Sequence, residues 1–312
     1  MRVERLQTCN PAHKLSGRNI GLEFHLHGSA FFIAKEDKVK FLRLLLCVLL
    51  LGLSSTAFTQ SQAHNPDAQK PATPPDWSAK EIILIGELHG TQETPRLFSN
   101  LVTVAAAREK RKRIGVGLEL PVALQRLIDE AVKNNTSIDS FREQLLADPA
   151  WQKIDDGRSS QSMLDLVCNT LKLAGSQKVS LFFFDTQVND RDDTMAQFIG
   201  QRVRAQGYDV TFILTGNIHA NKAPHHPRKK QVVPMGHRLE EQGFVLHSYD
   251  VGYSGGEAWV CTPECGVHSL KGWDIAADSA AIDQEGYDGI LFVGPIHASP
   301  PAHALLPGKG TQ

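Results

Sequence analysis

A carboxylate and an imidazole, Glu87 and His89, follow directly after the apolar run 82–85. A glutamate that orients a histidine can turn it into a general base, and both side chains are also metal ligands. The run consists of Ile and Leu and predicts a buried strand of a parallel sheet. Ligands bind outside the carboxyl ends of strands in open α/β sheets, so this spacing predicts that the two side chains belong to a functional site.

Polar side chains also follow three later apolar runs, 114–118, 179–184 and 210–214. They are Glu119, Asp185, Asn217 and His219, and Glu93 lies a little beyond the first run. If these strands are parallel, their polar side chains gather on one rim of the sheet. Carboxylates crowded on one rim repel each other and raise each other's pKa values. We therefore expect a metal, another cation or proton-transfer chemistry to use the rim.

Two kinds of chemistry stay open for this rim. In the first, a histidine acts as general base with a glutamate as its orienting partner, and together they activate water. In the second, two histidines and two glutamates bind a divalent metal, which activates the water itself. Both interpretations use the same side chains, which are Glu87, His89, Glu119 and His219. The sequence contains no compact HExxH-type ligand pair that would favour the metal.

Further residues are expected to bind from the edge of the rim. Arg191 and Asp192 stand at the start of a predicted helix, where acidic residues suit the helix dipole. Arg191 can also form ion pairs with the rim carboxylates. His297 follows the last predicted strand and can reach the same face. These residues complete the set of candidate binding residues: Glu93, Asp185, Arg191, Asp192, Asn217 and His297.

The elements that must position these side chains form a β/α alternation. Strands are expected at 82–85, 114–118, 179–184, 210–214, 244–248 and 289–293, with helical stretches between them. This pattern predicts an α/β fold with a mostly parallel sheet and helices on both faces. Two segments interrupt it: 135–160 is predicted to be a helical insertion and 253–270 a late β-hairpin. Cys261 and Cys265 flank a Pro-containing turn of the hairpin, which favours a disulfide over two reduced cysteines or a metal pair.

The N-terminal part of the chain is not expected to belong to this fold. Basic residues, a short apolar run and small residues over 39–63 are typical of a cleaved signal peptide, so we expect a periplasmic or secreted protein. Translation is then expected to start at Val39, which makes 1–38 a mis-annotated extension. The polar, Pro-rich segment 64–78 predicts a linker, and 79–312 a single domain.

The composition argues against several classes of function. The chain has 312 residues and a formal net charge of -1, so no basic excess points to nucleic acid as a partner. The apolar run of the leader is too short to cross a bilayer comfortably, and we expect no membrane span in the mature chain. No phosphate-binding glycine fingerprint or Gly-x-Ser-x-Gly elbow supports nucleotide binding or serine-esterase chemistry.

Four short motifs resemble the superfamily that joins the erythromycin esterases, the ChaN haem-binding lipoproteins and the Tiki/TraB proteins. The motif 86–93, Gly-Glu-Leu-His-Gly-Thr-Gln-Glu, resembles the first-strand signature of the esterases, and Glu119 in Gly-Leu-Glu resembles the second-strand glutamate. The segment 190–196 resembles the Arg-Asp helix start of ChaN, and 215–219 resembles the late Gly-Asn-x-His segment. The motifs occur in this order through most of 80–298.

The resemblance implies a parallel α/β core with its pocket at the carboxyl ends of the strands, and it places Glu87, His89, Glu119 and His219 in that pocket. It implies hydrolysis by activated water in the esterase branch, metal-dependent peptide cleavage in the Tiki branch and haem binding in the ChaN branch. The cofactor therefore stays open between none, a divalent metal and haem.

We expect an exported hydrolase that acts on an ester or amide bond of a small molecule or peptide. The reason is that acid–base groups are dense on the rim, whereas no cofactor fingerprint is visible. The first alternative is a haem- or iron-binding protein of the ChaN type, with His89, His219 or His297 as axial ligand. The second alternative is a non-catalytic ligand-binding module.

Overall fold

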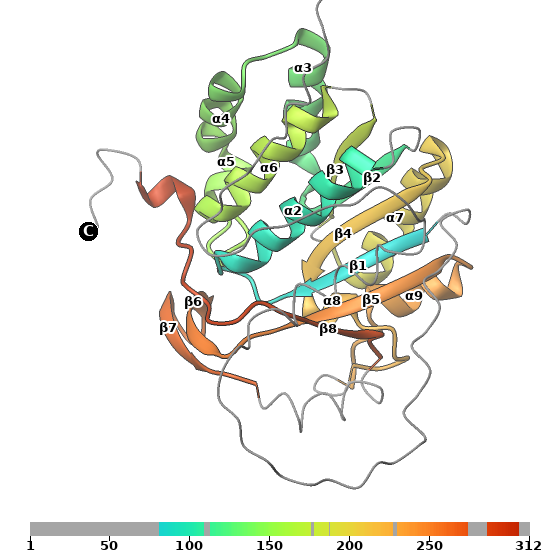
Figure 1. Cartoon of the computed structure of the whole chain (residues 1–312), viewed down its shortest axis with the longest axis vertical. Helices are drawn as coiled ribbons and strands as arrows, with labels where there is room; N and C mark the ends of the chain where they lie inside the picture. Colours follow the sequence, from blue (N-terminus) through green and yellow to red (C-terminus); the bar gives the residue numbers. More distant parts are fainter. Residues whose placement is uncertain are drawn as a thin grey trace, which may run out of the picture. The chain divides into compact units, whose positions relative to one another are not determined.

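A six-stranded parallel sheet forms the centre of the fold (Figure 1). The structure is a computed structural model, and it describes residues 81–108, 113–175, 178–186, 188–226, 230–273 and 286–305. The strand order is β3-β2-β4-β1-β5-β8. The strands are β1 (Glu81–Glu87), β2 (Ile114–Pro121), β3 (Val179–Asp185), β4 (Val210–Gly216), β5 (Val245–Gly252) and β8 (Gly289–Phe292). The expected α/β fold class is therefore confirmed.

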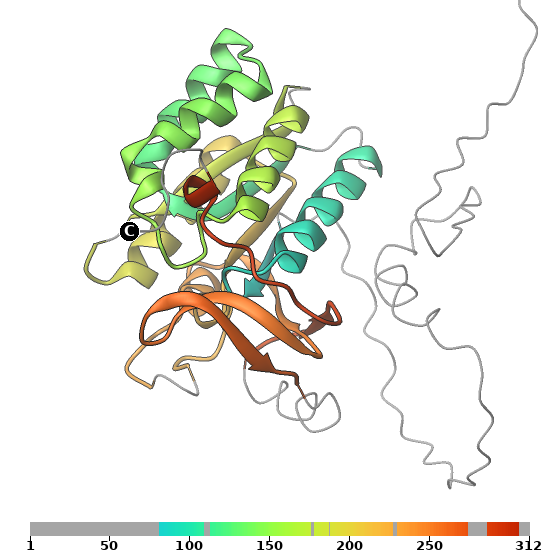
Figure 2. The ribbon, with the colours of Figure 1, turned by 90° about the vertical axis from the view of Figure 1, so that its left-hand side faces the viewer.

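Helices cover both faces of this sheet (Figures 1 and 2). On one face, α2 (Glu93–Arg108) packs against α6 (Gln161–Ala174). On the other face, α7 (Arg191–Gln206) packs against α9 (Met235–Glu241), with the short α8 (Asn217–Ala220) beside β1. The strands are therefore buried on both sides, as expected for parallel strands with continuous apolar runs.

The alternation of side chains along β1 divides the core between the two faces. Ile82 and Leu84 are buried in one cluster with Met195 and Ile199 of α7 and Leu239 of α9. The intervening side chains point to the opposite face, because successive residues of a strand alternate. On that opposite face α2 contributes buried apolar side chains of its own, Phe98 and Val102. Packing on both sides fixes where the carboxyl end of each strand lies.

The segments 135–160 and 253–270, which interrupt the β/α alternation, contain additional helices and a β-hairpin. After β2 the chain forms η1 (Val122–Leu124), α3 (Gln125–Asn134), α4 (Ile138–Ala147) and α5 (Pro149–Gln152). Ser137 caps α4 and Asp148 caps α5 by accepting main-chain N–H bonds. Irregular chain follows α5 and leads into α6.

The late hairpin consists of β6 (Gly255–Cys261) and β7 (Cys265–Lys271), which pair antiparallel outside the main sheet. A disulfide joins Cys261 to Cys265 at its turn. The described chain ends in η2 (Ala302–Leu305).

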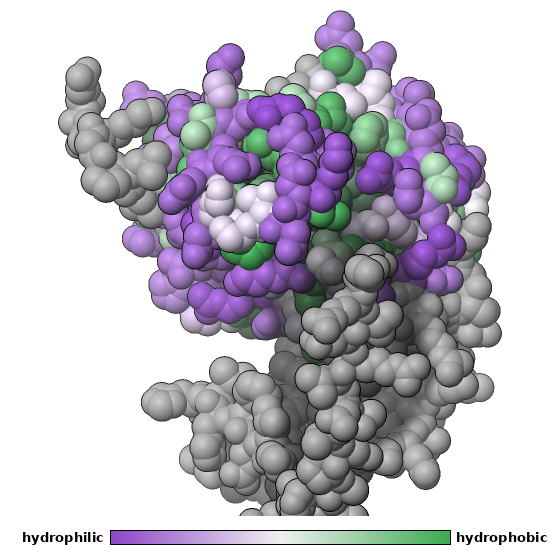
Figure 3. All heavy atoms as spheres, turned by 90° about the horizontal axis from the view of Figure 1, so that it is seen from above, coloured by the Kyte–Doolittle hydropathy of each residue, from purple (hydrophilic) through white to green (hydrophobic). Residues whose placement is uncertain are grey.

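The face visible in Figure 3 is mostly hydrophilic where residues are described. The large apolar side chains that are exposed there or elsewhere in the described ranges come from separate elements and loops; they are Val104, Val132, Val188, Val245 and Val267. Single exposed apolar residues are ordinary for a folded domain. No helix among the described residues is both long and apolar enough to cross a membrane. The expected extension, signal peptide and linker lie outside the described residues, so these expectations stay predictions.

Candidate active site

The carboxyl ends of four neighbouring strands carry the candidate side chains. Strand β4 lies between β2 and β1, and Gly216 at its end is paired in register with Glu87 of β1. The register between β2 and β3 shifts between Leu118 and Pro121, in the last residues of β2 where Glu119 lies. Such irregularities re-aim side chains at the edge of a sheet. The order of the strands therefore brings Asp185, Glu119 and Glu87 to one rim.

His89 is held by Glu87. The imidazole Nδ1 lies 2.9 Å from Glu87 Oε1, and Glu87 is only 3% exposed. The second oxygen of this carboxyl, Oε2, is buried without a hydrogen-bond partner in the described structure. Burial raises the pKa of Glu87, although the hydrogen bond with His89 opposes the rise. When Nδ1–H donates to Glu87, the basic lone pair of the imidazole is on Nε2.

The Nε2 atom of His89 faces a second carboxylate. It lies 3.8 Å from Glu119 Oε1, and no described residue forms a hydrogen bond with it. Burial acts to lower the pKa of His89, but Glu119 and Glu87 outweigh it and the pKa is raised. His89 therefore has one nitrogen fixed by a carboxylate and the other free to accept a proton.

Glu119 is a fixed anion. Its Oε2 accepts hydrogen bonds from Thr215 Oγ1 at 2.6 Å and from the Gly216 main-chain N–H at 2.7 Å. Its Oε1 accepts a hydrogen bond from Arg191 Nη2 at 2.5 Å. Burial opposes ionisation, but His219, His89 and the nearby guanidiniums hold the pKa of Glu119 well below its usual value. The carboxylate therefore stays charged and aligned.

Two arginines neutralise the crowded carboxylates. Arg191 Nε donates to Asp185 Oδ1 at 2.8 Å, and Arg158 Nη1 donates to Asp185 Oδ2 at 2.5 Å. Arg158 Nη1 also lies 3.4 Å from Glu119 Oε1, and its other nitrogens bind Asp156 at 2.8 and 3.0 Å. Burial acts against ionised Asp185, but Arg191 and Arg158 lower its pKa. The sequence predicted the role of Arg191 as an ion-pair partner but missed Arg158 and Asp156.

His219 is fixed at both nitrogens. Nδ1 lies 2.7 Å from Asp192 Oδ1, and Arg191 Nη1 lies 2.9 Å from Nε2. A guanidinium can only donate, so Nε2 accepts and Nδ1 carries the proton that is shared with Asp192. Asp192 also accepts the main-chain N–H of Met235 at 2.8 Å. His219 is thus an acceptor that orients Arg191, and it differs from His89 in having no free nitrogen.

The donor set does not fit a divalent metal. Among the described residues no group of three or more His, Cys, Asp and Glu side chains is arranged to hold a metal ion. Glu119, the central carboxylate, already binds a guanidinium, a hydroxyl and a main-chain N–H. A metal would have to displace Arg191, which also holds Asp185 and His219.

Glu93 and His297 form a separate pair. Glu93 at the start of α2 accepts the His297 main-chain N–H at 2.9 Å, and its other oxygen lies 2.9 Å from Nδ1. The His297 side chain is 67% exposed. In the described structure this pair has no hydrogen bond with the rim. Asn217 begins α8, and its carbonyl accepts the hydroxyl of Tyr287.

Two hollows open beside the rim. One of about 600 Å³ is lined by the end of β2, by α5 and the chain after it, and by Cys261, and it reaches the rim at Asp156 and Arg158. The other, of about 450 Å³, reaches the rim at Arg191 and Asp192. Both volumes fall in the usual range for small-molecule sites. The arginines therefore stand between the hollows and the buried carboxylates.

Among known proteins, this chain is similar to solved structures but matches no family model or curated sequence. A succinoglycan biosynthesis protein matches 71% of this chain and 84% of its own, with 8% identity and a TM-score of 0.48. A mutant of erythromycin esterase EreC in its open conformation matches 67% and 81%, with 13% identity and a TM-score of 0.39. ChaN of Campylobacter jejuni with cofacial haem matches 57% and 83%, with 12% identity and a TM-score of 0.38.

The matches include an erythromycin esterase and a ChaN protein, as the resemblance of the motifs led us to expect. At these identities and TM-scores the likeness concerns the fold and carries no conclusion about activity.

Proposed function

We propose that the chain is a hydrolase in which His89 activates water for attack on an ester or amide bond. The observation that carries this proposal is the state of the two nitrogens of His89. Nδ1 is held by the buried Glu87, whereas no described residue forms a hydrogen bond with Nε2. A general base needs this arrangement, because one nitrogen must be oriented and the other must be open to water.

The proposed reaction needs only groups of this chain. Nε2 of His89 removes a proton from water while the water oxygen attacks the substrate carbonyl. Glu87 and Glu119 stabilise the imidazolium that results. The imidazolium then returns its proton to the leaving alcohol or amine, so that the products are an acid and an alcohol or amine.

Arg191 supplies the positive charge for this reaction. Its side chain is 29% exposed, more than that of Arg158, and it is held in place by Asp185 and Glu119. A fixed donor is well suited to stabilise the oxyanion that develops on the substrate, because it does not have to reorganise during the reaction. The signal-peptide pattern of 39–63 leads us to place this activity outside the cytoplasm.

A second candidate function is haem binding through His297. Its Nδ1 is bonded to Glu93, and its side chain is exposed. Metal-ligating histidines commonly donate their other nitrogen to a carboxylate in this way. His219 is a poorer axial ligand, because Asp192 and Arg191 occupy both of its nitrogens.

One set of assays on the purified full-length protein tests both candidates. Ester and amide hydrolysis are screened, and hemin is titrated, with wild type, His89→Ala and His297→Ala. The hydrolase proposal predicts turnover that is lost in His89→Ala and kept in His297→Ala. A strong Soret band that only His297→Ala loses, without hydrolysis in any variant, would favour haem. If no variant shows hydrolysis or a Soret band, the result would favour the non-catalytic binding module.

A further inference from the structure

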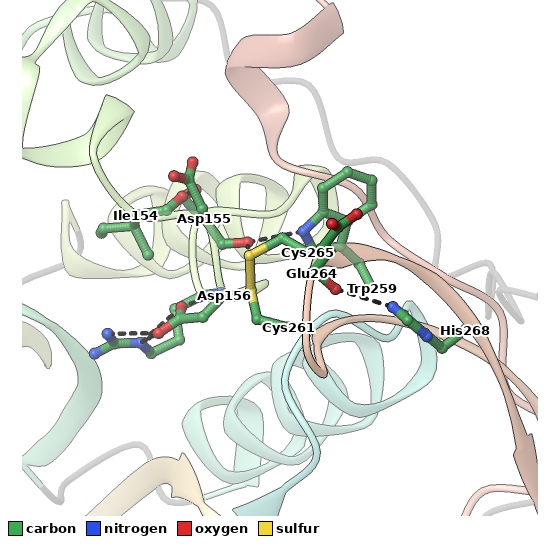
Figure 4. The surroundings of a disulfide bond; sticks show 10 residues. Ile154, Asp155, Asp156, Trp259, Cys261, Glu264, Cys265 and His268 are labelled. Atoms are coloured by element: carbon green, nitrogen blue, oxygen red, sulfur yellow. Dashed lines mark hydrogen bonds and ion pairs between the residues drawn. A yellow bond between two sulfur atoms is a disulfide. The ribbon is translucent and has the colours of Figure 1, made fainter.

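Trp259 of the hairpin β6–β7 lies beside Asp155, in the loop that leads to Arg158 (Figure 4). The main-chain N–H of Trp259 donates to the carbonyl of Gly90 at 2.9 Å, next to His89. Its indole Nε1–H donates to the carbonyl of Asp155 at 2.8 Å. Trp259 therefore connects two loops that are distant in the sequence, one that carries His89 and one that leads to Arg158.

The same two loops touch each other through their backbones. A Cβ on Gly157, whose φ is +89°, would lie 2.6 Å from Gly90 N. A Cβ on Gly90, whose φ is +76°, would lie 2.0 Å from the Trp259 carbonyl oxygen. Only glycine fits both the backbone conformation and the space at these positions. The three segments therefore pack backbone to backbone.

The loop that carries Arg158 has contacts from outside in addition to its own internal hydrogen bonds. Residues 153–158 form no helix or strand of their own. Asp156 binds the guanidinium of Arg158 from within the loop, and Cys261 Sγ of the disulfide lies 3.6 Å from the Asp155 carbonyl oxygen. Figure 4 shows the indole of Trp259 and the disulfide beside Asp155. The hairpin is thus the structure against which this loop is held.

We propose that Trp259 is a positioning residue, which keeps Arg158 against Glu119 and Asp185 by holding the Asp155 carbonyl beside the His89 loop. Trp259 touches none of the reacting groups, so its effect passes through Arg158. Burial and the Glu119 carboxylate act most strongly on the pKa of His89, and the positive charge of Arg158 opposes protonation. If Arg158 moves away, the pKa of His89 rises. For its effect on catalysis, this inference rests on the function proposed above.

The test measures the pKa of His89 directly in the full-length protein. NMR titration of histidine-labelled protein follows the His89 resonance, which is identified by its loss in His89→Ala. Trp259→Phe keeps an aromatic ring but removes the indole N–H, and Trp273→Phe is the matched control because Trp273 packs edge-on against Tyr253. We expect an upward shift in Trp259→Phe and none in Trp273→Phe. A ring that only stabilised the fold would leave the pKa unchanged.

A double-variant comparison tests the route through Arg158. Arg158→Gln should itself raise the pKa of His89, and Trp259→Phe should then add no further shift, because the two changes act on one interaction. Equal shifts from Trp259→Phe with and without Arg158 would overturn the proposal. If Trp259→Phe does not fold, the double variant Cys261→Ala/Cys265→Ala removes the contact of the disulfide with the Asp155 carbonyl and should give an upward shift of the same sign. An unchanged pKa in that variant would also overturn the proposal.

The activity measurement separates this inference from the proposed function. With hydrolysis present, Trp259→Phe should lower kcat/KM about tenfold at pH 7 with little change in KM, which corresponds to about 1.4 kcal/mol in the barrier. A shift in the His89 pKa without any hydrolysis in wild type would refute the hydrolase and leave the positioning role intact. Hydrolysis in wild type together with an unchanged His89 pKa in Trp259→Phe would support the hydrolase and refute the positioning role.

Discussion

The carboxylate of Glu119 and the guanidinium of Arg191 lie 2.5 Å apart at the centre of the rim. Arg191 also holds Asp185 and His219, so a single cation connects side chains of β2, β3 and the short helix α8. This arrangement offsets the repulsion between the carboxylates that are crowded on the rim. Guanidiniums neutralise the charge, and one imidazole stays free to exchange protons.

Hydrolysis should therefore be insensitive to chelators. Glu119 has no free position for a metal, since Arg191, Thr215 and Gly216 occupy its oxygens. We expect the same kcat/KM before and after dialysis against EDTA, and no increase when zinc, manganese or magnesium is added. Loss of turnover on dialysis that zinc restores would show that a metal replaces the guanidinium in the active form.

Glu87→Gln should lower activity while it raises stability at neutral pH. The loss of a charged hydrogen bond to His89, about 1.5–3 kcal/mol, predicts a roughly 10- to 100-fold lower kcat. Burial raises the pKa of Glu87 above 4.5, so the folded state binds its proton more tightly than the unfolded state. Wild type then loses stability as pH rises through the raised pKa, and the glutamine variant does not.

Melting temperatures check the stability part of this prediction. The variant should melt higher than wild type at pH 7, by about 2–4 °C for each kcal/mol, and the difference should shrink towards pH 4.5. Glu143→Gln is the matched control, because Glu143 lies exposed on α4 and the substitution is the same. A lower melting temperature of Glu87→Gln at pH 7 would contradict the argument.

The rate should depend on pH through His89. Burial acts to lower the pKa of His89, but Glu119 and Glu87 raise it above 6.5. Only the deprotonated imidazole accepts a proton from water, so kcat/KM should rise with pH through an apparent pKa above 6.5. Glu119→Gln removes the carboxylate next to Nε2 and should move this rise to lower pH. A rise that stays in place in Glu119→Gln would exclude His89 as its source.

Asp185 should contribute more to stability than a partly exposed carboxylate that pairs with an arginine. Its side chain is fully buried and bonded to both Arg158 and Arg191. Removing one member of a buried ion network typically costs about 3–5 kcal/mol. Asp165→Ala, which breaks a pair with Arg142 that is only partly buried, should cost less than about 1 kcal/mol. Urea unfolding measures the loss in free energy of unfolding for Asp185→Ala and for Asp165→Ala. A loss in Asp185→Ala no larger than that in Asp165→Ala would contradict the prediction.

Most of the fold could be predicted because the strands carry strong local signals. Runs such as 82–85 and 179–184 are apolar without interruption, and each is a strand of the sheet, β1 and β3. β5 extends to Gly252, beyond the predicted end at 248, because pairing with β1 and β8 continues through polar residues such as Asp250. Pairing between strands is set by tertiary contacts, which a local pattern does not contain.

The site could be predicted where its residues follow a strand or begin a helix. Glu87, Glu119 and Asp185 end β1, β2 and β3 or lie within their last residues, so parallel order alone brings them together. Arg158 lies in irregular chain after α5, with no periodic pattern around it, and its partners are 27 and 39 residues away. Only the turn-forming sequence Asp155-Asp156-Gly157 marks that place in the chain.

Chemical rescue of His89→Gly by imidazole tests the central claim most directly. Removing the side chain leaves a space beside Glu87 and Glu119 in which free imidazole can take the place of the missing base. The account predicts that His89→Gly loses at least about 100-fold in kcat, within the range for general bases. Added imidazole should restore turnover in this variant and leave His219→Gly unaffected. A variant of His89 that keeps full activity without imidazole would contradict the account.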